Sequence, residues 1–250
     1  MAKFEPDVYG RRPVVEALRA GHVERVYLAR EVREAPVLRE IDEAARAANV
    51  PVQRVLRAEL DRALANRNHQ GVAAAYHQHP YATLDDIMAA ADAAAEPGLV
   101  LALDGVQDPG NVGSLLRSAE GAGAHGVVLP RHRAAGVTPA VVRASAGAAE
   151  HLPIAQEANL TRTLEWFKRG GYWAIGLDEE GTTPYDRIDA GGPLVVVIGG
   201  EGKGLTRLVR EACDVTVRLP MRGRVGSLNA AVAGAIVLYE IRRQRDQARG

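Results

Sequence analysis

Cysteine is nearly absent from this 250-residue chain. Cys213 is the only one, which excludes an internal disulfide and a zinc site built from cysteine thiolates. Long apolar runs are missing as well, because no stretch approaches the roughly 18 residues needed to cross a bilayer. The first ten residues also lack the apolar core of a secretion signal. We therefore expect a cytoplasmic protein with no membrane partner.

The sequence has no net charge and few aromatic residues. The chain has 31 Lys and Arg against 31 Asp and Glu, so any attraction to a polyanion must come from a local basic patch. Aromatic residues make up 4% of the sequence, whereas Ala, Val, Leu and Gly are plentiful. That mixture suits short buried strands between alanine-rich helices, and it favours an α/β fold.

Composition and periodicity divide the chain into three segments. Residues 1–78 are predicted to form a small α/β domain, and the alanine-rich residues 79–97, which contain two prolines, a partly helical linker. Residues 98–250 are predicted to form a larger domain. The elements expected in the small domain are strands at 23–29, 50–55 and 71–76 and an amphipathic helix at 36–49.

The larger segment alternates between apolar strands and helices. LVLALDGV, HGVVLP, YWAIGL and PLVVVIGG are continuous apolar runs, which are typical of parallel strands covered on both faces. A last strand, TVRLP, leads through the loop MRGRVG to a long helix expected from Ser227 to about Gln247. Ligands of such sheets bind beyond the carboxyl ends of the strands. The polar, glycine-rich loops 104–117, 199–204 and 220–229 therefore form the candidate site.

Familiar phosphate-binding motifs do not fit these loops. A Walker A motif ending at Lys203 would need glycine where Val197 stands and Ser or Thr where Gly204 stands. GNVGS likewise has the wrong spacing for a dinucleotide-binding loop, and no G-x-S-x-G elbow is present. A nicotinamide, ATP or covalent-hydrolase site is thus poorly supported.

Metal binding is not predicted either. His69, His77 and His79 lie close in sequence, but their spacing is not that of a helical ligand pair. No neighbouring carboxylate or cysteine completes a ligand set.

Polar side chains in the three loops each have an ordinary structural interpretation. Ser227 suits a helix N-cap, Asn111 a turn, Glu201 a solvated turn and Arg117 an exposed helix position. Asn229 is harder to explain, because an amide at the second helical position is not needed for capping and must find a partner or face a cleft. Their gathering at one edge of the sheet indicates a polar site.

Basic residues supply candidate contacts to nucleic-acid phosphates. Arg242, Arg243 and Arg245, near the end of the last helix, are interpreted instead as complementing its dipole. The candidate RNA contacts are Arg11, Arg12, Arg131, Arg222 and Arg224.

DGVQDPGNVGSLLRSAEGAG, VVVIGGEGKGL and LPMRGRVGSLNAAVAGAIVLYE resemble, in order and spacing, the three motifs of the SpoU (TrmH-like) RNA ribose 2′-O-methyltransferases. YGRRPVVEAL, NHQGVAAAY and RASAGAAEHLPI further resemble the branch that methylates a guanosine ribose in the peptidyl-transferase region of 23S rRNA. The resemblance implies an SPOUT α/β domain with a C-terminal trefoil knot. It also implies a homodimer formed through that domain, bound S-adenosylmethionine, and an N-terminal L30e-like domain that recognises RNA.

The resemblance also assigns roles to individual residues. Asn111, Arg117, Glu201, Ser227 and Asn229 match the polar catalytic positions of the three motifs. The positions expected to contact the cofactor are Gly199, Gly200, Leu219, Met221 and Leu228.

The activity expected from the resemblance is S-adenosylmethionine-dependent methylation of a ribose in 23S rRNA or a pre-ribosomal particle. Two alternatives stay open: a ribose methyltransferase acting on tRNA or another rRNA site, and a non-catalytic RNA-binding assembly factor.

Overall fold

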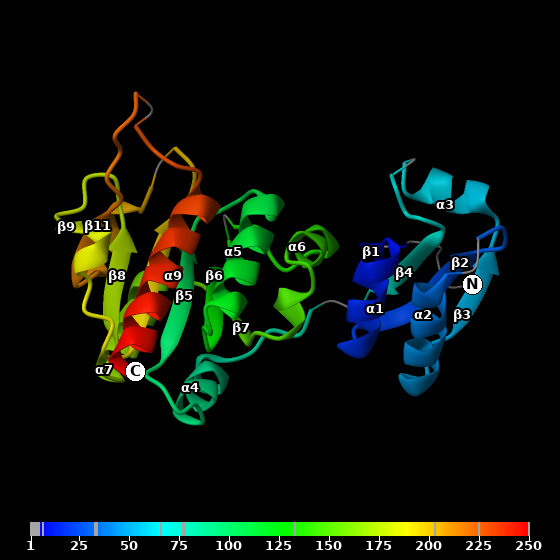
Figure 1. Ribbon diagram of the computed structural model, residues 1–250, viewed down its shortest axis with the longest axis horizontal. Coiled ribbons are helices and arrows are strands. Elements are labelled where there is room, and N and C mark those ends of the chain that lie inside the picture. The colour runs from blue at the N-terminus through cyan, green and yellow to red at the C-terminus, as the bar shows by residue number, and fades with distance from the viewer. Residues whose placement is uncertain are drawn as a thin grey trace. The chain divides into compact units, whose positions relative to one another are not determined.

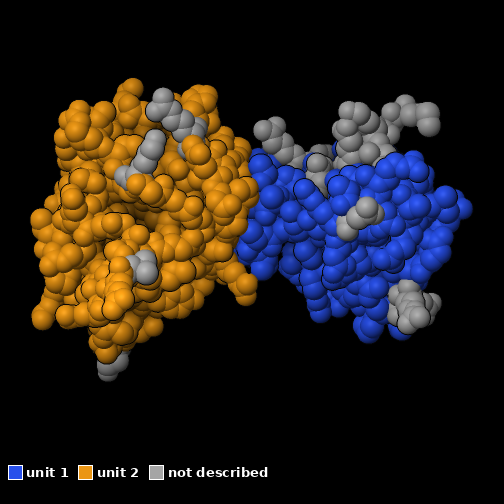
Figure 2. Space-filling view, turned by 90° about the horizontal axis from the view of Figure 1, so that it is seen from above, with its two compact units in different colours: residues 1–80, 137–151 blue, residues 81–136, 152–250 orange. Residues whose placement is uncertain are grey.

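The computed structural model describes residues 6, 8–32, 35–65, 67–76, 79–132, 134–202, 204–224 and 226–249. The chain forms two compact units (Figure 2). Unit 1 consists of Met1–Pro80 together with Val137–His151, and unit 2 of Tyr81–Gly136 and Leu152–Gly250. The segment Val137–His151 therefore folds with the N-terminal residues, although it is far from them in sequence.

Unit 1 is a sheet with helices on both faces. Its strands lie in the order β1-β4-β2-β3, with β2 parallel to β3 and antiparallel to β4. Side chains alternate along β2, so Val26 and Leu28 pack with α1 and α2 whereas Tyr27 and Ala29 pack with α3. The elements are β1 (Val8–Tyr9), α1 (Arg11–Arg19), β2 (Val23–Ala29), α2 (Pro36–Ala47), β3 (Val52–Val55), α3 (Arg57–Ala63), β4 (Val72–Tyr76), α6 (Pro139–Ala144) and the 3₁₀ turn η1 (Ala148–Glu150).

Unit 2 contains a sheet with the strand order β7-β6-β5-β10-β8-β11-β9, and every neighbouring pair is parallel. Its strands are β5 (Leu99–Asp104), β6 (Gly126–Pro130), β7 (Ile154–Glu157), β8 (Trp173–Leu177), β9 (Thr183–Pro184), β10 (Leu194–Gly199) and β11 (Val215–Arg218). Every residue of the central strands β5 and β10 is buried, as their continuous apolar sequences predict.

Helices cover both faces of this sheet. The helical elements of unit 2 are α4 (Leu84–Asp92), α5 (Pro109–Gly121), α7 (Leu160–Arg169), the 3₁₀ turn η2 (Tyr185–Arg187), α8 (Arg207–Ala212) and α9 (Ala230–Arg249). A core cluster joins α4, α7 and α8 to β5 and β10 through Ile87, Leu164, Val209, Val100 and Val195. None of the described helices is long and apolar enough to span a membrane.

Helices α5 and α9 lie side by side in unit 2 (Figure 1). Gly234 permits the close approach of α9, because a Cβ atom there would stand 2.5 Å from Leu115 of α5 and 3.4 Å from Ile198 of β10. The amino ends of both helices thereby reach the same edge of the sheet.

The predicted α/β class with a parallel sheet is confirmed. The strand at Val23–Ala29 has the predicted bounds, and the partly helical character of residues 79–97 is confirmed by α4. Two predicted helix starts are wrong. The last helix begins at Ala230 rather than at Ser227, and α5 begins at Pro109, so that GNVGS lies inside a helix rather than in a turn.

Candidate functional site

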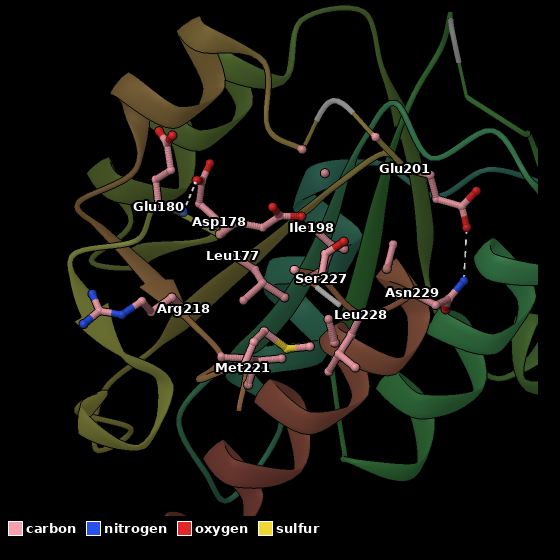
Figure 3. Close-up of a pocket in the computed structure, with 18 of the residues that line it drawn as sticks. Leu177, Asp178, Glu180, Ile198, Glu201, Arg218, Met221, Ser227, Leu228 and Asn229 are labelled. Atoms are coloured by element: carbon pink, nitrogen blue, oxygen red, sulfur yellow. Dashed lines mark hydrogen bonds between the residues drawn. The ribbon is translucent and has the colours of Figure 1, made fainter. Parts of the chain in front are cut away.

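The strands β5 and β10 are neighbours, and their last residues, Asp104 and Gly199, are paired in the sheet. From β5 the chain continues through α5 to β6 on one side, and from β10 it continues through α8 to β11 on the other. Diverging connections of this kind leave a crevice at the carboxyl ends of the strands. The cleft found at this edge of unit 2 has a volume of about 940 Å³ and is lined by the segments that follow β8, β10 and β11 and by the start of α9 (Figure 3).

Glycines give the loop after β10 its shape. A Cβ atom on Gly199 would lie 2.1 Å from the backbone carbonyl carbon of Gly204, and one on Gly200 would lie 2.4 Å from the carbonyl oxygen of Gly105. Both clashes are with backbone, which cannot move aside as a flexible side chain can. The loop therefore folds back against β5 only because these positions carry no side chain.

Asp104 holds the same loop in place through two hydrogen bonds. The backbone N–H of Thr206 donates to Asp104 Oδ2 at 2.6 Å, and the N–H of Gly200 donates to the Asp104 carbonyl oxygen at 2.9 Å. The carboxylate is buried at the end of β5, so these bonds are shielded from water. The loop that carries Glu201 is consequently held in one position.

Asn111, Glu201 and Asn229 form one hydrogen-bonded network, in which Glu201 and Asn229 line the end of the cleft and Asn111 is bonded to both of them. Asn111 Nδ2 donates to Glu201 Oε1, and Asn229 Nδ2 donates both to Asn111 Oδ1 at 2.9 Å and to Glu201 Oε1 at 3.1 Å. Figure 3 shows the Asn229 amide pointing at the Glu201 carboxylate. The three residues come from α5, the loop after β10 and the start of α9, so the structure brings one polar residue from each predicted loop together.

Asn229 is also the residue that caps α9. Its Oδ1 accepts from the backbone N–H groups of Ala231 at 2.9 Å and Val232 at 3.2 Å. This corrects the interpretation that Ser227 is the cap and that Asn229 has no capping role. Ser227 instead lines the cleft two residues before the cap Asn229, with its side chain exposed.

The network leaves one donor and one acceptor for a ligand. Both N–H groups of the Asn229 amide are used within the network, and its oxygen is used by the helix. Within the described part of the chain, Glu201 Oε2 and the second Nδ2 hydrogen of Asn111 have no partner. A hydroxyl group that donates to Oε2 and accepts from Nδ2 would complete both.

All the residues predicted to contact the cofactor line this cleft, namely Gly199, Gly200, Leu219, Met221 and Leu228. Met221 and Leu228 are large apolar side chains with 36% and 40% of their surface exposed. Figure 3 shows the two side chains close together on one side of the cleft, where they form an apolar wall.

Acidic residues line the opposite end of the cleft, and sequence reasoning missed them. Asp178, Glu179 and Glu180 follow β8 directly, and Figure 3 shows Asp178 and Glu180 across the cleft from Glu201. Asp178 is buried and forms a 2.7 Å ion pair with Arg210. The signal in the sequence was an acidic run immediately after an apolar strand. The cleft thus has carboxylates at both ends, and its lining also includes Arg210, Arg218 and Arg222, so it carries charge of both signs.

Arg117 does not join the network. It lies six residues after Asn111 on α5, about 9 Å along the helix axis, where its side chain is exposed. It is not part of the cleft lining, and it forms no hydrogen bond or ion pair with any other residue that the structure describes. Its guanidinium is accordingly available to an external group.

The predicted RNA-contacting arginines differ in their surroundings. Arg222 lines the cleft, and Arg224 and Arg131 are exposed. In unit 1, Arg12 is paired with Glu40 at 3.2 Å, and Arg11 Nε donates to the carbonyl oxygen of Gln70 at 3.3 Å.

The interpretation of the late arginines as dipole partners is wrong for two of them. Arg242 makes two 2.8 Å hydrogen bonds to the Glu96 carboxylate. Arg245 is buried and donates to the backbone carbonyls of Ala190, Pro97, Gly98 and Gly192. Arg242 and Arg245 therefore bind loops that lie next to α9, and they do not serve to complement its dipole.

Of the three histidines considered as metal ligands, His77 lies outside the described residues. His69 is hydrogen-bonded to Asp61 at 2.9 Å. His79 is buried in unit 1, beside a histidine and a carboxylate that are distant in sequence.

Comparison with known proteins agrees with this geometry. Residues 98–239 match the SpoU rRNA Methylase family, and residues 8–82 match the family described as RNA 2′-O ribose methyltransferase substrate binding. A protein of Mycolicibacterium vanbaalenii named "Uncharacterized tRNA/rRNA methyltransferase" is 46% identical over 242 residues, which cover 96% of this chain and 77% of the relative.

Solved structures are similar over nearly the whole chain. The SpoU methyltransferase AviRb from Streptomyces viridochromogenes, in complex with the cofactor AdoMet, has a TM-score of 0.80 and 31% identity, covering 96% of this chain and 89% of that one. An AdoMet-bound rRNA methyltransferase from Sinorhizobium meliloti has a TM-score of 0.78 and 28% identity, covering 96% and 87%.

Proposed function

The chain belongs to the SpoU rRNA methylase family of S-adenosylmethionine-dependent RNA methyltransferases, and we propose that its substrate is a ribose 2′-hydroxyl of 23S rRNA, on a guanosine of the peptidyl-transferase region. The observation that supports ribose methylation most directly is the Asn111–Glu201–Asn229 network at the end of the cleft. It offers one acceptor and one donor, the pair that a hydroxyl group needs.

The cleft fits S-adenosylmethionine by its chemistry. Met221 and Leu228 supply apolar surface for an adenosine. The backbone groups of Gly199, Gly200 and Leu219 supply hydrogen-bonding partners that no side chain hides. The lining carries both carboxylates and arginines, which suits a ligand that has an ammonium, a sulfonium and a carboxylate group. When bound, the cofactor supplies a methyl group made electrophilic by its positively charged sulphur.

The network residues position the hydroxyl. Glu201 Oε2 accepts the hydroxyl hydrogen and the free Asn111 N–H donates to its oxygen, so the oxygen is aimed along one direction. Ser227, which lines the same cleft, is assigned a further hydrogen bond to the ribose. Orientation of this kind converts a bimolecular encounter into an aligned displacement and is a large part of the catalysis that a protein can provide.

Arg117 is assigned to the RNA backbone. Its guanidinium has no competing partner among the described residues, so it can bind the target phosphate and stabilise negative charge developing on the 2′-oxygen. Because lysine lacks the planar two-pronged donor, Arg117→Lys should lose most methyl transfer although the charge is kept. Near wild-type activity of that variant would remove Arg117 from the site.

Further features follow from membership of the family and are part of the proposal. Unit 2 is the catalytic domain and has a C-terminal trefoil knot, and residues 1–78 of unit 1 recognise RNA with the help of Arg11 and Arg12. The active form is a cytoplasmic homodimer formed through the catalytic domain. Arg131, Arg222 and Arg224 contribute to RNA binding around the cleft.

The test is methyl transfer from labelled S-adenosylmethionine to 23S rRNA isolated from a strain that lacks the gene. We expect label on a single guanosine ribose, and none on rRNA from the parent strain, which is already modified. Asn111→Ala should abolish transfer. Ser118→Ala, on the same helix with its hydroxyl bonded to the Ser114 carbonyl, is the matched control and should retain it.

Two other outcomes would change the assignment. Label found on tRNA or on another rRNA nucleotide would keep the chemistry and move the target. No label on any RNA would indicate a non-catalytic RNA-binding assembly factor.

A further inference from the structure

A second cluster of chemically reactive side chains lies within unit 1, apart from the cleft. His22 follows α1, His79 follows β4, and Glu150 ends the turn η1. His22 Nε2 is 2.9 Å and His79 Nδ1 is 4.0 Å from Glu150 Oε2. One potential ligand atom from each residue lies within 4.8 Å of the other two.

We propose that His22, His79 and Glu150 bind a divalent transition-metal ion, for which Zn²⁺ is the best match. Two imidazole nitrogens and one carboxylate oxygen are a recognised ligand set for zinc, with water in the fourth position. The same donors suit other late first-row ions less selectively, and they suit Ca²⁺ and Mg²⁺ poorly because those ions prefer oxygen.

The distances are close to those that a metal requires. Ligands at about 2.0–2.1 Å from a tetrahedral zinc ion are separated by about 3.3 Å. The 2.9 Å and 4.0 Å separations bracket this value. The third pair, His22 and His79, lies within 4.8 Å, so the side chains must draw together to bind an ion. His22 keeps 17% of its side-chain surface exposed, which gives an ion a route to the buried Glu150 and His79.

An outer hydrogen bond orients the carboxylate. The Tyr76 hydroxyl donates to Glu150 Oε1 at 2.8 Å, which leaves Oε2 as the atom that faces the two histidines. Metal-binding carboxylates and histidines are usually held by such partners. The arrangement thus has both the ligands of a metal site and the support around them.

An ion at this position would join separate segments of unit 1. Glu150 belongs to Val137–His151, whereas His22 and His79 belong to the N-terminal residues of the same unit. A divalent cation bound by all three residues would fasten Val137–His151 to the rest of unit 1.

The test is calorimetric titration of the full-length, metal-stripped protein with Zn²⁺, accompanied by elemental analysis after dialysis. We expect one Zn²⁺ bound per chain and a rise in the melting temperature with Zn²⁺ concentration. Co²⁺ at the same site should give visible absorption bands of low coordination number. Absence of saturable binding by the wild-type chain would overturn the proposal.

Variants locate the ion. His79→Gln and Glu150→Gln should abolish the binding and the rise in melting temperature, and Tyr76→Phe, which keeps all three ligands, should weaken binding about 10- to 100-fold. His132→Gln, which changes an exposed histidine of unit 2, should bind as the wild type does. Unchanged affinity in a correctly folded Glu150→Gln or Tyr76→Phe chain would place the ion elsewhere and refute the site.

Discussion

Asn229 performs two tasks with opposite ends of one amide, and substitutions should separate them. Its oxygen caps α9 by accepting from Ala231 and Val232, and its nitrogen donates to Asn111 and Glu201. Replacement by alanine removes both functions. Replacement by serine keeps a capping oxygen and removes the amide donor, so it should damage the site while sparing the helix.

The expected stability change follows from the cap. Loss of an asparagine cap costs about 1 kcal/mol, within a range of about 0.5–2 kcal/mol. For a protein of this size that corresponds to a fall of about 2–4 °C in melting temperature. The exposed amide contacts add little to stability, because water replaces them when they are lost. Asn229→Ala should therefore melt about 2–4 °C below wild type, and Asn229→Ser within about 1 °C of it.

The chain contains a matched control for the cap alone. Asn159 caps α7 by accepting from the Arg162 N–H at 3.1 Å, and it lies outside the cleft lining. Asn159→Ala should lose a similar amount of stability to Asn229→Ala and keep full activity. A destabilised helix end is thereby distinguished from a damaged site.

Methyl transfer should fall equally in both Asn229 variants, although only one of them loses the cap. Without the Asn229 amide, Asn111 and Glu201 lose their shared donor, and a misplacement of about 1 Å at a reacting group can cost about 10²-fold in rate. We expect kcat for Asn229→Ala and Asn229→Ser to fall by about that factor, with little change in the affinity for S-adenosylmethionine measured by calorimetry. Loss of cofactor binding would reassign Asn229 to the cofactor site, and wild-type kcat for Asn229→Ser would refute the network as the positioning device.

Other perturbations test the loop, the thiol and the surface charge. Gly199→Ala should abolish cofactor binding in calorimetry and lower the melting temperature, because the new Cβ would lie 2.1 Å from the Gly204 backbone. Burial raises the pKa of Cys213 to about 12, so the native protein should resist iodoacetamide at pH 8 and react once unfolded; fast native labelling would contradict this burial. Hydrogen bonds from Arg243 lower the pKa of Glu240 to about 2 from 4.5, so its stabilisation should be complete above pH 4.5 and vanish as the pH falls through 2. The difference between wild type and Glu240→Gln in urea unfolding should shrink over that window, and a constant difference would refute the ion pair.

The strands of unit 2 can be predicted from the sequence because their apolar composition indicates that they are buried. β5 and β10 are continuous apolar runs. A strand that is covered on both faces needs apolar side chains on both of them, so such a run indicates a buried strand. The predicted start of α5 is wrong because Gly110 and Gly113, read in isolation, favour a turn. The physically stronger signal was Asp108 followed by Pro109, since an aspartate cap and a proline at the first position favour a helix start.

Ser227 and Asn229 show where local rules stop. Both residue types are good caps, so the sequence around them does not decide which one begins the helix. The choice between the two caps depends on residues that are distant in sequence. Asn111 and Glu201 accept hydrogen bonds from the Asn229 amide and hold it at the start of α9. Because the helix then begins at Ala230, the hydroxyl of Ser227 lies too early in the chain to cap it. Choosing the cap therefore required knowing that α5, β10 and α9 meet at one edge of the sheet.

The histidine cluster of unit 1 was invisible in the sequence for the same reason. Along the chain, His79 is grouped with His69 and His77, and no neighbouring carboxylate completes a ligand set. The carboxylate comes from Glu150, and the second imidazole from His22, each brought in by a different part of the unit 1 fold. Spacing rules detect ligands that share a helix or a loop, whereas a site assembled from three segments is detected only when the packing of the segments is known. Spacing alone does not reveal the network in the cleft either; its residues are predicted because each of the three segments resembles a family motif, whereas no such motif indicates the histidine cluster.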